Sequence, residues 1–403
     1  MTFELIEYES KRFPRDSISR EQADVIWTQF GKQIAIEFPS PKTDGEWELQ
    51  SQGYVGYVPL SPEVGFSLKP RVDIGNLFRM LEYAYRLKFR FFNELIELES
   101  LEEFYERLAN VLAKRTLDRG RKGFYRSYEP RTEDLPYVRG SFDLMRRVSR
   151  PWEVRITCDY QDHTPDIVEN QILVWTLMKI ARSGACTERV LPFVRRAYRS
   201  LHGSVSTQPF SAEDCIGRLY NRLNDDYEPL HALCRFFLEH TGPSLSVGEH
   251  QMLPFLIYMP RLFELFVAEW LRTHLPAEYS ISEQEQVRIG ENYDLNFEID
   301  LVVYDTRTGK AAAVLDTKYK IHDEPVGQDV QQILAYAVSK DCTLGILIYP
   351  RHLPVPHKQR AGKIRVRSLA FPLNGDLEAQ GTAFLSSLLR TLSGASQAVS
   401  SAG

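Results

Sequence analysis

The segment from Phe297 to Lys320, FEIDLVVYDTRTGKAAAVLDTKYK, constrains the fold more than any other part of this sequence. Apolar and polar residues alternate up to Val303, and a more continuous apolar run covers Ala311–Tyr319. Between these runs lie Asp305 and Gly309, which are residue types typical of tight turns. The segment therefore predicts two neighbouring strands joined by a short turn.

Acidic and basic side chains come together at the end of the second predicted strand. Because strand side chains alternate between faces, Asp316, Lys318 and Lys320 are expected on one face and Thr317 on the other. Asp300 lies on the neighbouring strand, and carboxylates from two strands can bind a hard divalent cation such as Mg²⁺. Such a cation polarises a phosphodiester, while the lysine stabilises the charge of the transition state. The same pattern also fits a surface hairpin with a plain ion pair between Asp316 and Lys318, and the segment alone leaves both possibilities open.

Size and charge limit what the rest of the chain can be. At 403 residues the chain exceeds one ordinary hydrophobic core, so we expect two or three domains. Hydrophobic residues make up 43% and charged residues 26% of the chain, which is typical of a soluble globular protein. The formal net charge of -5 excludes a chain coated in basic residues, so contact with nucleic acid would depend on local patches or bridging metal ions.

The cysteines and the apolar runs indicate a cytoplasmic protein. The 5 cysteines are scattered without a CxxC pair, and their odd number excludes a complete disulfide framework. Phe3, Glu4 and Glu7 follow Met1 in place of a basic region and an apolar core, so no signal peptide is expected. The longest apolar runs are far too short to cross a bilayer, so we expect no membrane contact.

Residues 1–160 are expected to form a mixed domain that is mostly β. Proline and glycine separate short runs with strand character, and apolar residues with helical spacing follow them. The expected strands cover residues 34–38, 47–50, 54–60 and 66–70, and the expected helices cover residues 74–86 and 101–117.

A segment rich in arginine and aromatic residues lies between Asp118 and Arg150. Its cationic side chains could hold DNA phosphates or face a protein partner. A solvated loop and strand edge with positive charge is the simpler alternative, and the sequence leaves these possibilities open. The residues concerned are Arg119, Arg121, Lys122, Arg126, Arg131, Arg139, Arg146, Arg147 and Arg150, with Phe124, Tyr125, Tyr128 and Tyr137 between them.

Residues 161–245 are expected to be helical. Thr164 can cap a helix with Pro165 at its first position, and the apolar residues that follow have helical spacing. Further helices are expected at residues 188–201 and 213–239, the second interrupted near Pro229. Antiparallel packing of these helices would form a bundle or stalk.

Residues 246–390 are expected to form an α/β domain around the hairpin. A helix over Met252–His274 places Glu264 among apolar neighbours, which is a costly position for an unpaired charge. Glu264 is therefore either a further metal ligand or orienting acid, or the partner of a cation such as Arg261. A helix over residues 328–339 puts Gln332 and Tyr336 on one face, because they lie four residues apart.

The carboxy-terminal elements complete the expected architecture. A strand at residues 343–349 can lie parallel to the strand that begins at Ala311, through a right-handed crossover. Residues 391–403, rich in Ser, Ala and Gly, are expected to be a disordered tail. The whole chain is therefore expected to be α+β and multidomain, with a mostly β amino-terminal domain, a central helical bundle or stalk, and an α/β carboxy-terminal core.

Two family resemblances follow from these motifs. The predicted site resembles the core of the PD-(D/E)XK nucleases with the QxxxY helix found in several of their branches. The wider chain, from about residue 50 to 350, resembles the McrC family of McrBC-type modification-dependent restriction systems. This second likeness rests on residues 54–87, YVGYVPLSPEVGFSLKPRVDIGNLFRMLEYAYRL, and residues 164–182, TPDIVENQILVWTLMKIAR.

The resemblance implies an enzyme and a site. The implied activity is that of an endonuclease that hydrolyses phosphodiester bonds of double-stranded DNA. The implied cofactor is Mg²⁺, with Mn²⁺ as the alternative. The implied residues are Asp300, Asp316 and Glu264 for the metal, Lys318 as the catalytic lysine, and Gln332 with Tyr336 in support.

The resemblance also implies partners. Members of the family work with McrB, an AAA+ GTPase hexamer that engages the amino-terminal part of McrC and reads the modified base. Since Gly309-Lys310 is followed by alanine and no GxxxxGK[ST] loop is present, GTP is expected to bind the partner and not this chain. Two alternatives remain: a non-catalytic activator or adaptor of the GTPase with a degenerate nuclease core, and a stand-alone nuclease of DNA repair.

Overall fold

The chain forms two compact units in a computed structural model, residues 1–101 with 255–403 and residues 102–254. The structure describes residues 2–61, 64–87, 101–142, 144–149, 152–183, 186–241, 245–247, 250–252, 254–289, 295–319 and 327–400. Arg150 and Lys320, named in the expectations above, lie outside these ranges, and so do the side chains of Arg146 and Arg147. No helix in these ranges is long and apolar enough to span a membrane.

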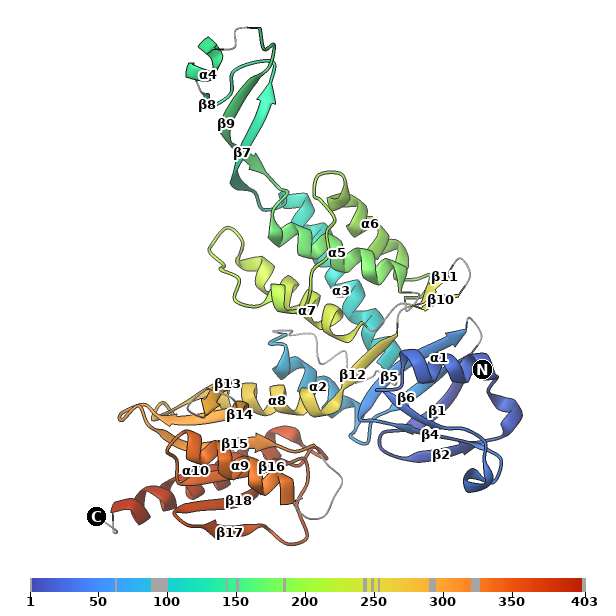
Figure 1. Ribbon diagram of the computed structural model, residues 1–403, viewed down its shortest axis with the longest axis vertical. Coiled ribbons are helices and arrows are strands. Elements are labelled where there is room, and N and C mark those ends of the chain that lie inside the picture. The colour runs from blue at the N-terminus through green and yellow to red at the C-terminus, as the bar shows by residue number, and fades with distance from the viewer. Residues whose placement is uncertain are drawn as a thin grey trace. The chain divides into compact units, whose positions relative to one another are not determined.

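The first unit contains two small sheets from the amino-terminal part of the chain (Figure 1). One has the order β1-β6-β5-β12, in which β12 is the later segment Phe255–Tyr258, and the other has the order β2-β4-β3. Phenylalanines of both sheets pack together, since the ring of Phe3 lies 5.2 Å from those of Phe13 and Phe66. The four strands expected in this region are confirmed within about two residues at each end. The elements are β1 Thr2–Ile6, β2 Ser10–Phe13, α1 Arg20–Gln29, β3 Ile34–Glu37, β4 Trp47–Ser51, β5 Tyr54–Ser61 and β6 Val64–Lys69.

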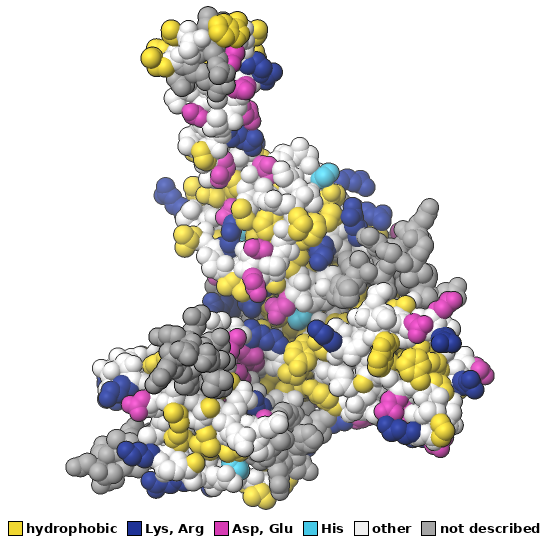
Figure 2. Space-filling view, in the orientation of Figure 1, with side chains coloured by type: hydrophobic (Ala, Val, Ile, Leu, Met, Phe, Trp, Pro, Cys, Tyr) yellow, Lys and Arg dark blue, Asp and Glu magenta, His cyan; other side chains and the backbone are white. Residues whose placement is uncertain are grey.

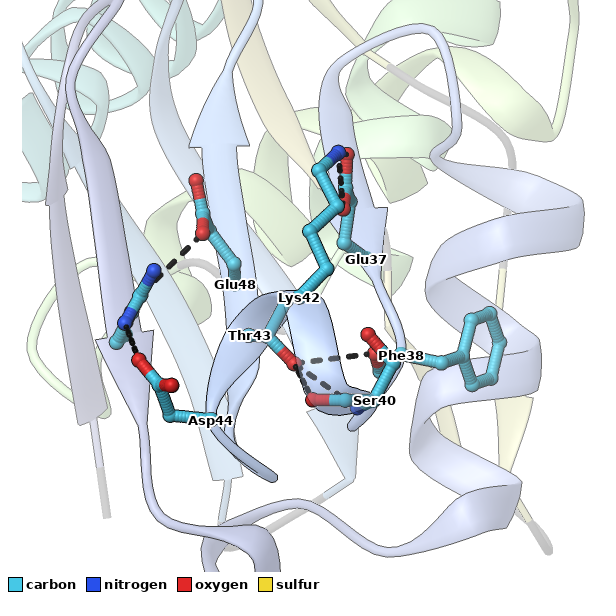
Figure 3. Close-up of polar contacts among 8 residues, drawn as sticks. Glu37, Phe38, Ser40, Lys42, Thr43, Asp44 and Glu48 are labelled. Carbon is cyan, nitrogen blue, oxygen red and sulfur yellow. Dashed lines mark hydrogen bonds and ion pairs between the residues drawn. The ribbon is translucent and has the colours of Figure 1, made fainter.

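Ion pairs surround the connection between β3 and β4 (Figure 3). Lys42 Nζ donates to both carboxylate oxygens of Glu37, at 2.7 and 2.9 Å. Arg12 on β2 contacts Asp44 Oδ2 at 2.6 Å and Glu48 Oε2 at 3.4 Å. Because most of these side chains are exposed, each pair is expected to contribute little to stability.

The hairpin expected at residues 297–320 lies inside a six-stranded sheet with the order β13-β14-β15-β16-β18-β17. β14 and β15 pair antiparallel, while β15, β16 and β18 run parallel. Helix α9 lies between β15 and β16 in the chain and packs on both of them, which confirms the expected crossover connection. The elements are β13 Tyr279–Ile289, β14 Leu295–Asp305, β15 Ala311–Thr317, α9 Gly327–Ser339, β16 Leu344–Tyr349, β17 Lys358–Ala361 and β18 Ile364–Ala370.

Helix α8, Met259–His274, carries Trp270, the largest fully buried side chain among the described residues of the first unit. Its Phe266 lies 4.9 Å from Phe371, ring centre to ring centre, and its Trp270 lies 5.4 Å from the same ring. α2, Ile74–Ala84, and α10, Leu377–Ser400, also pack against α8. Residue 381 of α10 must be glycine, because a Cβ there would lie 2.1 Å from the Trp270 ring.

The start of α8 differs from the expectation. A helix is expected from Met252, but residues 255–258 form β12, which pairs antiparallel with β5. Gly56 of β5 makes this pairing possible, since its φ is 131° and a Cβ there would lie 2.0 Å from the carbonyl oxygen of Phe255. The pairing joins residues 255–403 to the amino-terminal sheets. Domain boundaries are expected after residues 160 and 245. The compact units instead meet after residues 101 and 254 of the chain.

The second unit contains a group of helices, as expected for this part of the chain. α5 packs against both α6 and α7. Two aromatic contacts join α3 to α7: Phe104 to Phe236 at 6.0 Å and Tyr105 to Phe237 at 5.0 Å. The helices are α3 Leu101–Lys122, α5 Val168–Arg182, α6 Leu191–His202 and α7 Glu228–His240.

α5 begins at Val168, so the expected helix start at Thr164 and Pro165 is wrong. Thr164 is the last residue of β9 and pairs with Ser127. The Asn170 side chain donates to the carbonyl of Pro165 at 2.6 Å, which holds the chain in a turn before the helix.

The helix expected at residues 213–239 is confirmed only in its second part, as α7 from Glu228, and the expected disordered tail differs from the structure. Residues 213–227 contain only the short 3-10 turns Glu213–Cys215 and Asp225–Tyr227, because Gly217 between them has a left-handed backbone with φ 70°. α10 continues to Ser400, so the tail is not disordered over residues 391–400. The buried Leu388 and Leu392 hold this helix against the unit. Residues 401–403 lie outside the described ranges.

The second unit also carries an arm made of β7, β8, α4 and β9 (Figure 1). Its strands form a sheet with the order β7-β9-β8. At the base of the arm, Tyr227 donates to Asn170 Oδ1 at 2.6 Å and accepts from the backbone N–H of Tyr125 at 3.0 Å. The elements are β7 Ser127–Leu135, β8 Ser141–Phe142, α4 Leu144–Ser149 and β9 Ile156–Thr164.

The other end of the arm exposes apolar side chains, which gather in the yellow patch at the top of Figure 2. We call this cluster the arm tip. An exposed apolar cluster of this kind marks an interaction surface more often than a plain solvent face. Its residues are Tyr137, Val138, Leu144, Met145, Val148, Trp152 and Val154, between 52% and 84% exposed.

Glu7, just after β1, gives the first unit a pH-dependent stability. Its side chain is buried, and burial raises its pKa from 4.5 to about 7 against the opposing effects of Tyr319 and Arg71. Between these two pKa values the unfolded chain has lost the proton and the folded chain keeps it. Rising pH therefore favours unfolding by about 3 kcal/mol across this window.

Glu7→Gln is expected to remove this dependence. The free energy of unfolding of both proteins is measured by denaturation from about pH 4 to about pH 8. Over this range the parent should lose about 3 kcal/mol of stability relative to the variant. Glu4→Gln on β1 is the control, because Lys69 lowers the pKa of Glu4 and the shift should then have the opposite sign. A constant difference between Glu7→Gln and the parent would contradict burial of a titrating Glu7.

Candidate functional site

Lys318 lies at the centre of the site residues that the structure brings together. Its Nζ contacts Asp316 Oδ2 at 2.8 Å and Oδ1 at 3.0 Å, and donates to Gln332 Oε1 at 3.1 Å. Its backbone N–H donates to the carbonyl of Ile348 on β16 at 2.8 Å. Lys318 therefore stays attached to the sheet just beyond the end of β15, with its ammonium group between β15 and α9.

Gln332 and Tyr336 lie on one face of α9, as predicted. Gln332 Nε2 donates to the Tyr336 hydroxyl at 2.6 Å, and that hydroxyl donates to the backbone carbonyl of Glu298 on β14 at 2.8 Å. A chain of hydrogen bonds thus runs from β14 through α9 to Lys318. These hydrogen bonds fix the orientation of the Gln332 amide, so that its oxygen faces the lysine and its nitrogen faces Tyr336.

Asp300 is held by Thr317 of the neighbouring strand. Asp300 Oδ2 accepts from the backbone N–H of Thr317 at 2.9 Å and from its hydroxyl at 3.1 Å. The expectation that Thr317 faces away from the site is therefore wrong. The strand ladder ends at the pair Leu301 and Leu315, and beyond it the Asp300 carboxylate turns toward the Thr317 backbone.

Negative charge is concentrated around the buried Asp316. The residue is 0% exposed, and burial together with the charge of Asp300 raises its pKa from 3.8 to about 7, although Lys318 opposes the shift. Burial lowers the pKa of Lys318, but the charges of Asp316, Asp329 and Asp300 outweigh burial and raise it. The lysine therefore stays protonated, and the site as a whole favours one more positive charge.

Glu264 on α8 pairs with a cation, which is one of the two roles expected for it. Its Oε1 accepts from Arg261 Nη1 at 2.5 Å and from Gln284 Nε2 at 3.4 Å. Burial raises the pKa of Glu264, Arg261 opposes the shift, and the nearby charge of Asp300 adds to it. Glu264 therefore lies within electrostatic reach of Asp300 while bound to its own arginine.

Two residues near the site were not predicted. Asp329 is 3% exposed, and its Oδ1 lies 4.0 Å from Lys318 Nζ. Its position three residues before Gln332 on α9 is the signal that could have identified it. Tyr319 follows Lys318, lies 5.8 Å from the ring of Phe263 on α8, and is buried.

The residues fit a divalent cation in part. Asp316 Oδ2 is buried and accepts no well-directed hydrogen bond, although it lies near Lys318 Nζ. Asp300 supplies a second carboxylate, and oxygen ligands suit Mg²⁺. Among the described residues, however, no group of three or more His, Cys, Asp or Glu side chains is close enough to hold a metal. The fit therefore rests on Asp300 and Asp316, because Glu264, the third expected ligand, pairs with Arg261.

Four of the arginines expected to contact DNA or protein between residues 118 and 150 are paired with acids of the same unit. Arg131 and Arg139 both contact Asp162, at 3.5 and 2.9 Å. Arg119 contacts Asp226 at 3.4 Å, and Arg121 contacts Asp118 at 2.7 Å. The structure therefore favours the simpler alternative for these four side chains, because acids of the same unit neutralise them.

Comparisons with known proteins identify the family to which this chain belongs. The family described as McrBC 5-methylcytosine restriction system component matches residues 49–350. The type IV methyl-directed restriction enzyme EcoKMcrBC of Escherichia coli K12 is 22% identical over 322 residues, which is 72% of this chain and 89% of that protein. A chain of the solved Thermococcus gammatolerans assembly of McrB AAA+ hexamers with bound McrC aligns with a TM-score of 0.56 at 16% identity, covering 97% of this chain and all of that one. The chain therefore belongs to the McrBC 5-methylcytosine restriction system component family.

Proposed function

We propose that this chain is the DNA endonuclease subunit of a GTP-dependent, modification-dependent restriction complex. The observation that carries the proposal is the contact of Lys318 with both Asp316 and Gln332, beside Asp300. This acid, acid and lysine arrangement, supported by Gln332 and Tyr336, supports a PD-(D/E)XK nuclease core in residues 246–390. Family membership supports the restriction role.

The proposed chemistry is hydrolysis of a DNA phosphodiester. Asp300 and Asp316 would hold Mg²⁺ or Mn²⁺, which supplies charge to polarise the phosphate and lower the pKa of the attacking water. Lys318 would stabilise the negative charge that develops on the phosphate. Asp316 and Gln332 keep the ammonium group in place before substrate binds, so little reorganisation is needed at the moment of reaction.

Glu264 remains a proposed third metal ligand. Its carboxylate now binds Arg261 and Gln284, so a role at the metal requires it to exchange or share these contacts. The same observation favours a second candidate function, a non-catalytic activator of the GTPase with a degenerate nuclease core. In that case Asp300 and Asp316 would not bind a cation.

The proposed partner is a McrB-like AAA+ GTPase hexamer that binds GTP and reads the modified base. The solved assembly that shares this fold contains such hexamers with McrC bound. Within the expected partner-binding region, residues 1–160, the arm tip is the exposed apolar cluster that suits a protein contact. We propose that the arm tip contacts the hexamer and stimulates its GTPase, while double-stranded DNA is cut at the Lys318 site.

Metal binding separates the two candidate functions. Mg²⁺ that binds the folded state is expected to raise the stability of the chain by about 2.7 kcal/mol at a free concentration about 100 times its Kd. Asp316→Asn removes one carboxylate and should remove most of this gain. The measurement is thermal unfolding in Mg²⁺ and in a chelator, with Asp305→Asn as the control because Asp305 lies at the other end of the same hairpin. An equal Mg²⁺ response in the parent and Asp316→Asn, or none in either, would support the activator.

A further inference from the structure

Helix α6 in the second unit carries a basic face directed at solvent. Lys and Arg side chains gather over this helix in Figure 2. The opposite side of the helix is buried through Val194, Ala197 and Leu201. At 100° per residue, the exposed cationic residues fall within one sector of about 120° on the other side. They are Arg195, Arg196, Arg199 and His202, which we call the α6 basic face.

The arginines of the α6 basic face have no acidic partner among the described residues. Among the described residues of the second unit, ion pairs involve Arg119, Arg131 and Arg139 but none of the arginines on α6. α6 itself contains no acidic residue. Arginines held apart from acids retain their full charge for a ligand, whereas those of the arm are already neutralised.

The histidine of this face is held in place by its neighbours. The ring of His202 stacks on Tyr198 at 4.8 Å and 22°, and its Nδ1 lies 3.1 Å from the Tyr198 hydroxyl and 3.2 Å from Thr207 Oγ1. The end of the face is therefore ordered, while the arginines extend from the preceding turns.

We propose that the α6 basic face binds the phosphate backbone of double-stranded DNA and holds the duplex on the second unit. This inference rests on the proposed nuclease function for its choice of polyanion. Arg195 and Arg199 lie one helical turn apart, so they can contact separate phosphates along one groove edge. Such contacts carry no sequence information, which suits a subunit that leaves recognition of the modified base to a partner.

The composition of the face favours DNA over an acidic protein. The buried centre of a protein interface is typically apolar, whereas the exposed large apolar side chain described next to the α6 basic face is Phe193, 42% exposed, at its edge. The apolar side chains suited to a protein contact lie instead at the arm tip. Within the second unit, the arm tip therefore has the character of a protein-binding surface, and the α6 basic face that of a nucleic-acid-binding surface.

The test is DNA binding by the full chain in a chelator, so that no strand is cut. Binding of an unmodified duplex is followed by fluorescence anisotropy over a range of salt concentrations. Arg195→Ala with Arg199→Ala should lower the salt dependence, the slope of log affinity against log salt, by about 2 and weaken binding at least about tenfold. Both side chains are exposed, so the thermal midpoint should not change.

The matched control is Arg131→Ala with Arg139→Ala, which removes the same charge from side chains that are already paired with Asp162. It should leave the salt dependence unchanged. Equal slopes for the parent and the α6 variant, or a loss confined to binding of the AAA+ partner, would overturn the inference. A chain that binds DNA through α6 but never cuts it would contradict the proposed nuclease function and leave this inference standing.

Discussion

Asp316→Asn abolishes DNA cleavage by the complex while GTP hydrolysis by the partner continues: this is the largest effect we expect. The carboxylate is buried, contacts Lys318 and lies beside the charge of Asp300. Removing it takes away a metal ligand and the group that positions the lysine. A loss of about 4 kcal/mol of transition-state stabilisation corresponds to a rate about a thousandfold lower. The measurement is the rate of cleavage of modified DNA in the presence of GTP and Mg²⁺.

The control for this variant is Asp305→Asn on the same hairpin. Asp305 holds the turn through its Oδ1, which accepts from the backbone N–H groups of Arg307 and Thr308, and asparagine can accept in the same way. Cleavage by Asp305→Asn should equal that of the parent. A folded Asp316→Asn protein that still cuts DNA would show that the chemistry lies elsewhere.

Trp152→Ala is expected to weaken GTPase stimulation, which Asp316→Asn leaves intact. Trp152 lies in the arm tip and is 75% exposed, so its removal leaves the fold of the arm intact. A tryptophan at the centre of a protein interface commonly contributes about 2 kcal/mol or more, which corresponds to roughly 30-fold weaker binding. Titration of the variant into the partner, with GTP hydrolysis as the signal, should show this shift.

Trp27→Ala is the matched control for the arm tip. Trp27 is 61% exposed on α1 in the first unit, away from the arm in the chain. Its removal should leave GTPase stimulation unchanged. Equal stimulation by the Trp152→Ala protein and the parent would exclude Trp152 of the arm tip as part of the contact with the partner.

Local sequence patterns predicted those parts of the fold that depend on short-range spacing. The β14 and β15 hairpin followed from alternation and turn residues, and its parallel neighbour β16 followed from the helix between them. Gln332 and Tyr336 could be placed together because residues four apart share a helix face. The contact between Asp316 and Lys318 also follows from strand geometry.

The features that were missed depend on contacts between distant parts of the chain. The pairing of β12 with β5 requires Gly56 to meet Phe255, and no local pattern links these residues. Thr317 contacts Asp300 beyond the last pair of the β14 and β15 ladder, and strand alternation does not predict where that pairing ends. The basic segment between residues 118 and 150 looked available for DNA because its acidic partner Asp162 lies on another strand.

Charge on a helix was the weakest signal in the sequence. α6 is one of several helices with arginines, and its periodicity shows only which side is buried. Whether an arginine is free depends on acids brought near by the fold. The structure alone distinguishes Arg195 and Arg199 from the paired Arg131 and Arg139.

We propose that one chain holds two separable functions, cutting at the Lys318 site and GTPase stimulation through the arm tip. The most direct measurement reconstitutes the parent, Asp316→Asn and Trp152→Ala chains with the AAA+ partner, GTP and Mg²⁺, on DNA with and without 5-methylcytosine. Cleavage and GTP hydrolysis are followed in the same reaction. We predict that the parent cuts only the modified DNA, that Asp316→Asn retains only GTPase stimulation, and that Trp152→Ala at limiting concentration loses both. Cleavage of unmodified DNA by the parent without its partner, or by Asp316→Asn with it, would contradict this account.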